Sequence, residues 1–151
     1  MNKAFLITFL ICWTLLQPSI SQSTLTSTLE IKFIGVRNSK GLIAIGINSS
    51  PEGWPRQPQM DPNWKKTDIV NGVFTARVEN LPYGTYAISV LDDENSDLEM
   101  DMFMGIPKEG YGFSMNPHIK LSAPKFEECS FLLDKPYKQI TIDLRYVGKE
   151  R

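Results

Sequence analysis

The chain contains 151 residues, with 16 basic and 17 acidic side chains and a formal net charge of −1. A balance this close to neutral argues against nucleic acid or an anionic membrane surface as the main partner. Hydrophobic residues make up 42% of the chain, enough for one domain with its own core.

The N-terminus has the three-part composition of an export signal. Lys3 gives a basic start, Ala4–Leu16 is apolar and uncharged, and the small residues of Ser-Ile-Ser precede Gln22. The apolar run is shorter than the about 20 residues that span a bilayer, so a cleaved signal is favoured. A retained membrane anchor is the alternative. We predict a signal peptide at residues 1–21 and a single exported domain at residues 22–151, periplasmic or extracellular.

Cleavage at this site leaves one cysteine, Cys129, so the mature chain can form no internal disulfide. Removing Lys3 changes the basic count from 16 to 15 against 17 acidic residues, a net charge of −2. The fold must therefore be held together by the burial of apolar surface.

Most of the mature chain alternates between apolar and polar residues, the period of half-buried strands. Leu29, Ile31 and Phe33 share one face of the first strand, and Leu42–Ile47 is expected to pair with it as a hairpin. No segment of helical length shows a helical period. Strands are predicted at residues 29–33, 42–47, 73–78, 85–91, 118–121, 129–133 and 139–146.

About seven short strands separated by Gly, Pro and Asn turns are typical of an all-β domain. We predict a single antiparallel β-sandwich, immunoglobulin-like or prealbumin-like. Two segments break the regularity: Asn48–Asp68, with four prolines, and Asp92–Ser114, with the densest acidic run. The second is expected to be one elaborate loop on a strand scaffold.

Several motifs occur together: LPYGTY ending at Tyr86, DDEN from Asp92, GIPKEGYGFS at Gly105–Ser114 and PKFEEC ending at Cys129. With these motifs the chain resembles an uncharacterised family of exported proteins found mostly in Gram-negative bacteria. The resemblance implies a small β-sandwich outside the cytoplasm and no established reaction. LPYGTY is also similar to turns of prealbumin-like and carboxypeptidase-regulatory sandwiches. Relatives tend to have His at Asp92 and an Asn-Gly-rich turn at Ser96–Glu99, from which this chain departs.

The acidic run suggests a possible calcium site. Calcium takes about six to eight oxygen ligands, and a loop with carboxylates at alternate positions can present several at once. Leu98 stands where the usual calcium loop has a glycine, so a solvated acidic loop without metal is the alternative. The predicted calcium ligands are Asp93, Asn95, Asp97, Glu99 and Asp101.

Four aromatic residues in the irregular segments are candidates for ligand binding. Tyr111 and Phe113, each next to glycine, are expected to form a stacking surface for a sugar or a peptide, or else to cover an open end of the sandwich. Trp54 and Trp64 have the same two interpretations, as ligand contacts or as a small hydrophobic cluster.

No catalytic residues are predicted. Cys129 and His118 are the single thiol and imidazole of the mature chain, and no nucleophile, zinc or phosphate-binding motif occurs. We therefore predict a non-enzymatic module that binds a protein or glycan partner at the cell envelope. The alternative is a hydrolase-like enzyme that uses two acids of Asp92–Asp101.

Overall fold

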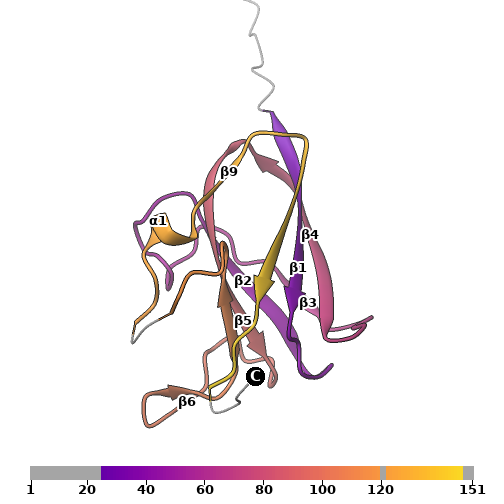
Figure 1. The fold of residues 1–151 in the computed structure, drawn as a ribbon, viewed down its shortest axis with the longest axis vertical. Helices are drawn as coiled ribbons and strands as arrows, with labels where there is room; N and C mark the ends of the chain where they lie inside the picture. Colours follow the sequence, from indigo (N-terminus) through magenta and orange to yellow (C-terminus); the bar gives the residue numbers. More distant parts are fainter. Residues whose placement is uncertain (1–24, 120–121, 148–151) are drawn as a thin grey trace, which may run out of the picture.

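The computed structural model describes residues 25–119 and 122–147 (Figure 1). The predicted signal peptide lies outside these residues. The described part is all-β, as predicted, with ten strands and one helical turn. The elements are β1 (Thr26–Ile34), β2 (Leu42–Asn48), β3 (Asn63–Lys65), β4 (Val73–Pro82), β5 (Gly84–Asp93), β6 (Met102–Phe103), β7 (Ile106–Pro107), β8 (Gly110–Phe113), α1 (Phe126–Cys129), β9 (Phe131–Leu133) and β10 (Tyr137–Asp143).

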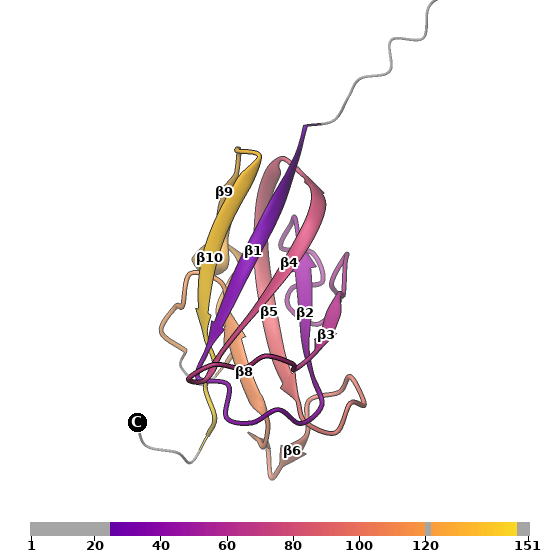
Figure 2. The ribbon, with the colours of Figure 1, turned by 90° about the vertical axis from the view of Figure 1, so that its right-hand side faces the viewer.

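Two sheets form the body of the domain (Figures 1 and 2). One has three strands in the order β10-β1-β4; the other has five, with β3-β2-β5-β8 side by side and β9 paired with the start of β5. All pairings are antiparallel except β1 with β10, which is parallel and departs from the predicted arrangement. This follows from the connection between β9 and β10, which carries the chain from one sheet to the other.

One hydrophobic core draws side chains from both sheets. Leu29, Ile31 and Phe33 of β1 are fully buried in it, as the alternation predicts. Burial of this apolar surface is the dominant stabilising contribution in a domain without a disulfide. The other strand residues of the core are Ile43, Ile45, Ile47, Phe74, Ala76, Leu81, Tyr86, Ile88, Val90, Phe131, Leu133 and Ile142.

The predicted hairpin between the first two strands is wrong. β1 pairs with β4 and β10, whereas β2 pairs with β3 and β5 in the other sheet. The connection crosses between the sheets and contains Gly35 and Gly41, with φ of 88° and 68°. A Cβ on Gly41 would lie 1.9 Å from the carbonyl oxygen of Asp93, so only glycine fits there.

Two of the predicted strand positions also need correction. His118 and Ile119 form no strand, and residues 120–121 lie outside the described part. Cys129 belongs to α1 rather than to a strand, because Glu128 accepts a hydrogen bond from the Lys125 amide at 2.7 Å and closes a helical turn. β9 therefore begins at Phe131.

Strand β8, which lies inside the segment expected to be a loop, joins the two sheets along one side. The amides of Tyr111 and Arg145 each donate to the other residue's carbonyl oxygen, at 3.0 and 2.8 Å. A Cβ on Gly110 would lie 2.4 Å from the Tyr146 ring, so this close approach requires glycine.

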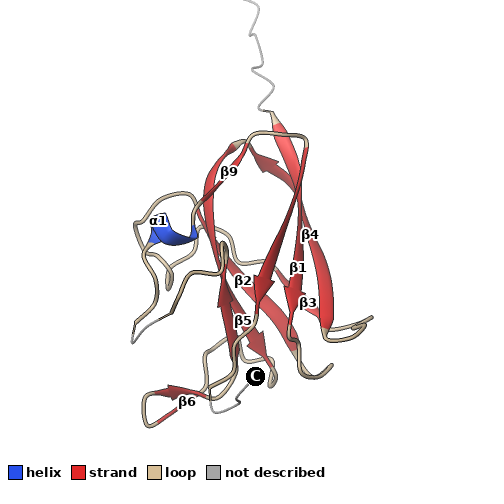
Figure 3. Ribbon diagram, in the orientation of Figure 1, coloured by secondary structure: helices blue, strands red, loops and turns tan. Residues whose placement is uncertain are grey.

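The outer face of the five-stranded sheet carries a second apolar cluster. It consists of Ala87, Phe113, Phe126 and Cys129, with Trp54 packed against them. Figure 3 shows α1 on this side of the molecule, away from the three-stranded sheet. The cluster covers only part of the outer face, and the remainder forms the surface described next.

Candidate functional site

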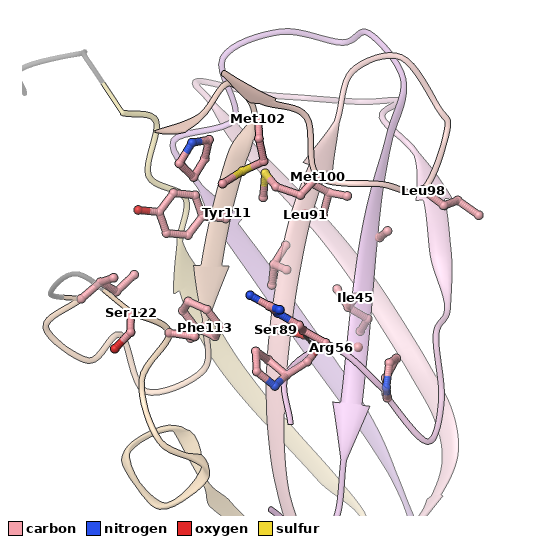
Figure 4. Close-up of a pocket in the computed structure, with 18 of the residues that line it drawn as sticks. Ile45, Arg56, Ser89, Leu91, Leu98, Met100, Met102, Tyr111, Phe113 and Ser122 are labelled. Atoms are coloured by element: carbon pink, nitrogen blue, oxygen red, sulfur yellow. Dashed lines mark hydrogen bonds between the residues drawn. The ribbon is translucent and has the colours of Figure 1, made fainter. Parts of the chain in front are cut away.

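An apolar groove of about 720 Å³ lies on the outer face of the five-stranded sheet (Figure 4). Its floor belongs to three neighbouring strands. Leu91 of β5 lies between Ala44 of β2 and Tyr111 of β8 in the sheet register. Because side chains alternate along a strand, this row and the row two residues further along, Gly46, Ser89 and Phe113, face the same side of the sheet. The floor residues are Ala44, Gly46, Ser89, Leu91, Tyr111 and Phe113.

Three segments wall the groove. The loop 55–61 approaches the floor closely at Gly46, where a Cβ would lie 2.8 Å from Ser89 Oγ and 3.0 Å from the Cβ of Pro58. The second wall leads into the β6–β7 hairpin, and in Figure 4 the side chains of Met100 and Met102 point over the floor. Ile119, Ser122 and Ala123 lie on the third side. The second wall contains Leu98, Met100, Met102, Gly105, Ile106 and Pro107.

The four aromatic residues predicted to contact a ligand lie in three different places in the structure. Tyr111 and Phe113 line the groove. Trp54 lies behind it: its ring packs against Phe113 at 5.8 Å between centroids, and its Nε1 donates to the Pro124 carbonyl oxygen at 2.9 Å. Trp64 is in β3 and packs against the main core, so it is not part of the groove.

Two charged side chains, Arg56 and Asp61, line the groove. Among the residues that the structure describes, none forms a hydrogen bond or an ion pair with the guanidinium of Arg56. In Figure 4 this side chain extends over the floor beside Ser89. The groove therefore combines an apolar lining with one cation that has no protein partner in the described part.

The acidic run is organised by Asp93, whose side chain is fully buried. Its carboxylate accepts hydrogen bonds from the amides of Ser96, Asp97 and Leu98 at 2.6, 3.3 and 2.9 Å. Beside it, Asn95 Nδ2 donates to Asp97 Oδ2 at 2.7 Å. The Asp93 carboxylate thus holds the loop's own backbone.

Glu109 is a second buried carboxylate under this loop. It accepts hydrogen bonds from the amides of Glu94 at 2.9 Å and Asp101 at 3.2 Å, and burial raises its pKa. Within residues 25–119 and 122–147, no three His, Cys, Asp or Glu side chains are grouped as a metal site. Calcium binding by the acidic run stays a prediction.

A buried polar cluster closes the end of the main core nearest the loop. Asp92 accepts hydrogen bonds from Lys66 Nζ and from the Tyr146 hydroxyl, and both Lys66 and Asp92 have fully buried side chains. Nearby, Glu94 pairs with Arg37 and accepts from Asn38 Nδ2 at 2.8 Å. The hydrogen bond from Arg37 lowers the pKa of Glu94. The cluster ties four distant segments together, and sequence alternation did not reveal it.

The thiol of Cys129 is fully buried, and this burial raises its pKa to about 12. A thiol in this environment is not ionised at neutral pH and is a poor nucleophile. His118 is exposed in the loop that follows β8.

Sequence reasoning missed Arg56, Leu91 and the two methionines as parts of one site. The available signal was the pair of apolar residues Met100 and Met102, two positions apart, a spacing that puts both side chains on one side of an extended segment. The methionines lie near β5 and the loop 55–61 because of the strand order in the sheet, which the local sequence does not show.

Comparison with known proteins gives one match. No curated protein and no solved structure matches the chain significantly. A family model described as "Uncharacterized protein conserved in bacteria (DUF2141)" matches residues 31–141, most of the described domain. The chain therefore belongs to the DUF2141 family of conserved bacterial proteins.

Proposed function

We propose that this protein is a non-enzymatic binding module whose ligand occupies the groove on the outer face of the five-stranded sheet. The observation that carries this proposal is the groove itself, with its volume of about 720 Å³ and mainly apolar lining. Small-molecule sites have volumes of about 300–1,000 Å³ and similar linings. Apolar surface gathered in one concave place is typical of a binding site.

The lining favours an apolar ligand over the glycan that we expected as one partner. Recognition of a sugar needs several hydrogen-bonding side chains around an aromatic face. The polar side chains of the lining are Arg56, Asp61, Ser89, Tyr111 and Ser122, and they are outnumbered by apolar residues such as Leu91, Met100 and Ile106. An apolar molecule or apolar protein segment fits this surface better.

Several contacts favour binding over the alternative of catalysis by the acidic run. A glycosidase needs two carboxyl groups free to reach substrate. Asp92 and Asp93 of the run are fully buried and hydrogen-bonded, and Glu94 is paired with Arg37. Asp97, Glu99 and Asp101 are exposed, and Asp97 accepts hydrogen bonds from Asn95 Nδ2 and the Glu99 amide within the loop. The acids that form these bonds stabilise the loop.

The proposed place of action is the cell envelope or the medium, supported by the signal-like composition of residues 1–21. Within the described residues, no helix has the length and apolarity needed to cross a membrane. N-terminal sequencing of the protein recovered outside the cytoplasm tests this part. It should begin at Gln22, and an intact Met1 would contradict export with cleavage.

Dye binding tests the groove. N-phenyl-1-naphthylamine is uncharged and fluoresces strongly when it enters an apolar site, so a titration of the wild type should give saturable fluorescence. Ser89→Phe places a ring on the floor at the Arg56 end of the groove and should weaken binding at least about tenfold, because the ring occupies the ligand's space.

Thr85→Phe is the matched control. Thr85 is exposed, points to the same face of the same strand, and lies about 13 Å further along, outside the groove. It should leave dye affinity unchanged, and thermal unfolding should verify that both variants are folded. Equal dye affinity in Ser89→Phe and wild type would refute the groove as the binding site.

A further inference from the structure

The groove has different chemistry at its two ends. In Figure 4, the Arg56 side chain lies over the floor beside Ser89, and Met100 and Met102 lie toward the opposite end, past Leu91. The guanidinium has no hydrogen-bond or ion-pair partner among the described residues. A cation at one end of an apolar channel matches a ligand with an anionic head and an apolar body.

Carboxylate is the head group that suits Arg56 best. A guanidinium presents donors in a planar fork that binds a carboxylate through two parallel hydrogen bonds. The hydroxyl of Ser89, beside the Arg56 side chain in Figure 4, donates to the Pro55 carbonyl oxygen at 3.4 Å, so Arg56 is the principal donor for the head group. The Arg56 side chain is exposed, so water screens this contact in part and the expected gain is smaller than that of a buried pair.

Asp61 is the other charged residue of the lining and must be considered with Arg56. Its neighbours Met60 and Pro62 bond to the backbone of β2, through Ile47 and Ile45, at 2.8 and 3.0 Å. Asp61 is therefore held at the β2 side of the groove, whereas the Arg56 side chain reaches β5. No ion pair joins the two side chains.

The body of the ligand is better matched by an alkyl chain than by a peptide. A peptide brings amides and carbonyls that need hydrogen-bond partners when they lose water. The floor strands β2, β5 and β8 already use their backbone groups in pairing with one another. The flexible thioethers of Met100 and Met102 can adapt to a chain without specific polar contacts.

We propose that the groove binds a long-chain carboxylate, with its head on Arg56 and its chain along Leu91 toward Met100 and Met102. This inference rests on the proposed function and names the class of its ligand: a fatty acid or a molecule that ends in a similar alkyl carboxylate. The groove volume of about 720 Å³ is of the size that holds such a molecule.

Displacement of N-phenyl-1-naphthylamine by three chain-matched competitors tests the proposal. Laurate, dodecanol and dodecylamine have the same alkyl length and differ in head-group charge. The wild type should bind laurate about tenfold more tightly than dodecanol, the gain expected for a partly exposed charge-assisted contact. Arg56→Met should remove this preference while retaining the affinity for dodecanol and the dye.

Lys40→Met is the matched control: it removes an exposed cation outside the groove and should keep the preference for laurate. Arg56→Lys should keep part of it, because the charge remains and the planar fork is lost. Equal affinities for laurate and dodecanol, or tightest binding of dodecylamine, would overturn the inference. Absence of dye binding in the wild type would instead refute the proposed function, so the two failures are distinguishable.

Discussion

Replacement of Lys66 by methionine should strongly destabilise the fold. The side chains of Lys66 and Asp92 are both 0% exposed, so the variant leaves the carboxylate buried with only the Tyr146 hydroxyl as partner. Breaking a buried ion pair from one side costs about 3–5 kcal/mol. In a domain of this size each kcal/mol lowers the midpoint of thermal unfolding by about 2–8 °C, so a drop of roughly 6 °C or more is expected.

Thermal unfolding followed by circular dichroism measures this effect. Arg77→Met is the control: it removes an ion pair in which the arginine side chain is 63% and the Glu30 side chain 10% exposed, and Gln139 still donates to the Glu30 carboxylate, so the midpoint should fall much less. The double variant Lys66→Met/Asp92→Leu should recover much of the loss, because no buried charge is left without a partner. A Lys66→Met midpoint within about 2 °C of the wild type would refute this reasoning.

Three further predictions concern the loop and the second cluster. Asp93→Ala should lower the unfolding midpoint even in chelator, because three amides lose their acceptor. The calcium prediction has its own test: millimolar calcium should raise the wild-type midpoint by several degrees, and an unmoved midpoint would contradict it. Cys129 should react with a maleimide only after unfolding, and Cys129→Ala should cost about 1 kcal/mol; rapid labelling of the native protein would show the thiol exposed. Arg37 lowers the pKa of Glu94 below its ordinary 4.5, so this pair stabilises the fold above that pH and its contribution is lost as the pH falls through the lowered pKa. Glu94→Gln should therefore lose less stability than the wild type in acid unfolding, and identical pH profiles would contradict the assignment.

Alternation in the sequence predicted the faces of the long strands correctly. Leu29, Ile31 and Phe33 are core residues because their period of two matches a strand with one buried face. The same pattern does not say which strand is the partner, since any apolar face can pack against any other. The hairpin of β1 with β2 was therefore wrong, although both strands exist.

Strand β8 could not be predicted from propensity, because glycine weakens strands in general. Here Gly110 and Gly112 are required by close packing: a Cβ on Gly112 would lie 2.8 Å from the Cγ2 of Ile142. The constraint comes from a residue 30 positions away and becomes visible only when the sheets are assembled.

The candidate site was predicted only in part for the same reason. Tyr111 and Phe113 were singled out by their glycine neighbours, and both line the groove. Arg56 and Met102 come from loops whose approach to β5 depends on the sheet order, so no local pattern places them together. The charge of the acidic run suggested a calcium site, whereas the Asp93 carboxylate accepts hydrogen bonds from amides of the same loop.

The most direct test of the proposed groove is a backbone amide spectrum of the isotope-labelled domain, titrated with N-phenyl-1-naphthylamine. Aromatic rings of the dye shift the resonances of nearby amides. We predict shifts in β2, β5 and β8 around Ala44, Ser89 and Tyr111, with β1 and β4 unchanged. Shifts centred on β4, or none at saturating dye, would contradict binding in the groove on the outer face of the five-stranded sheet.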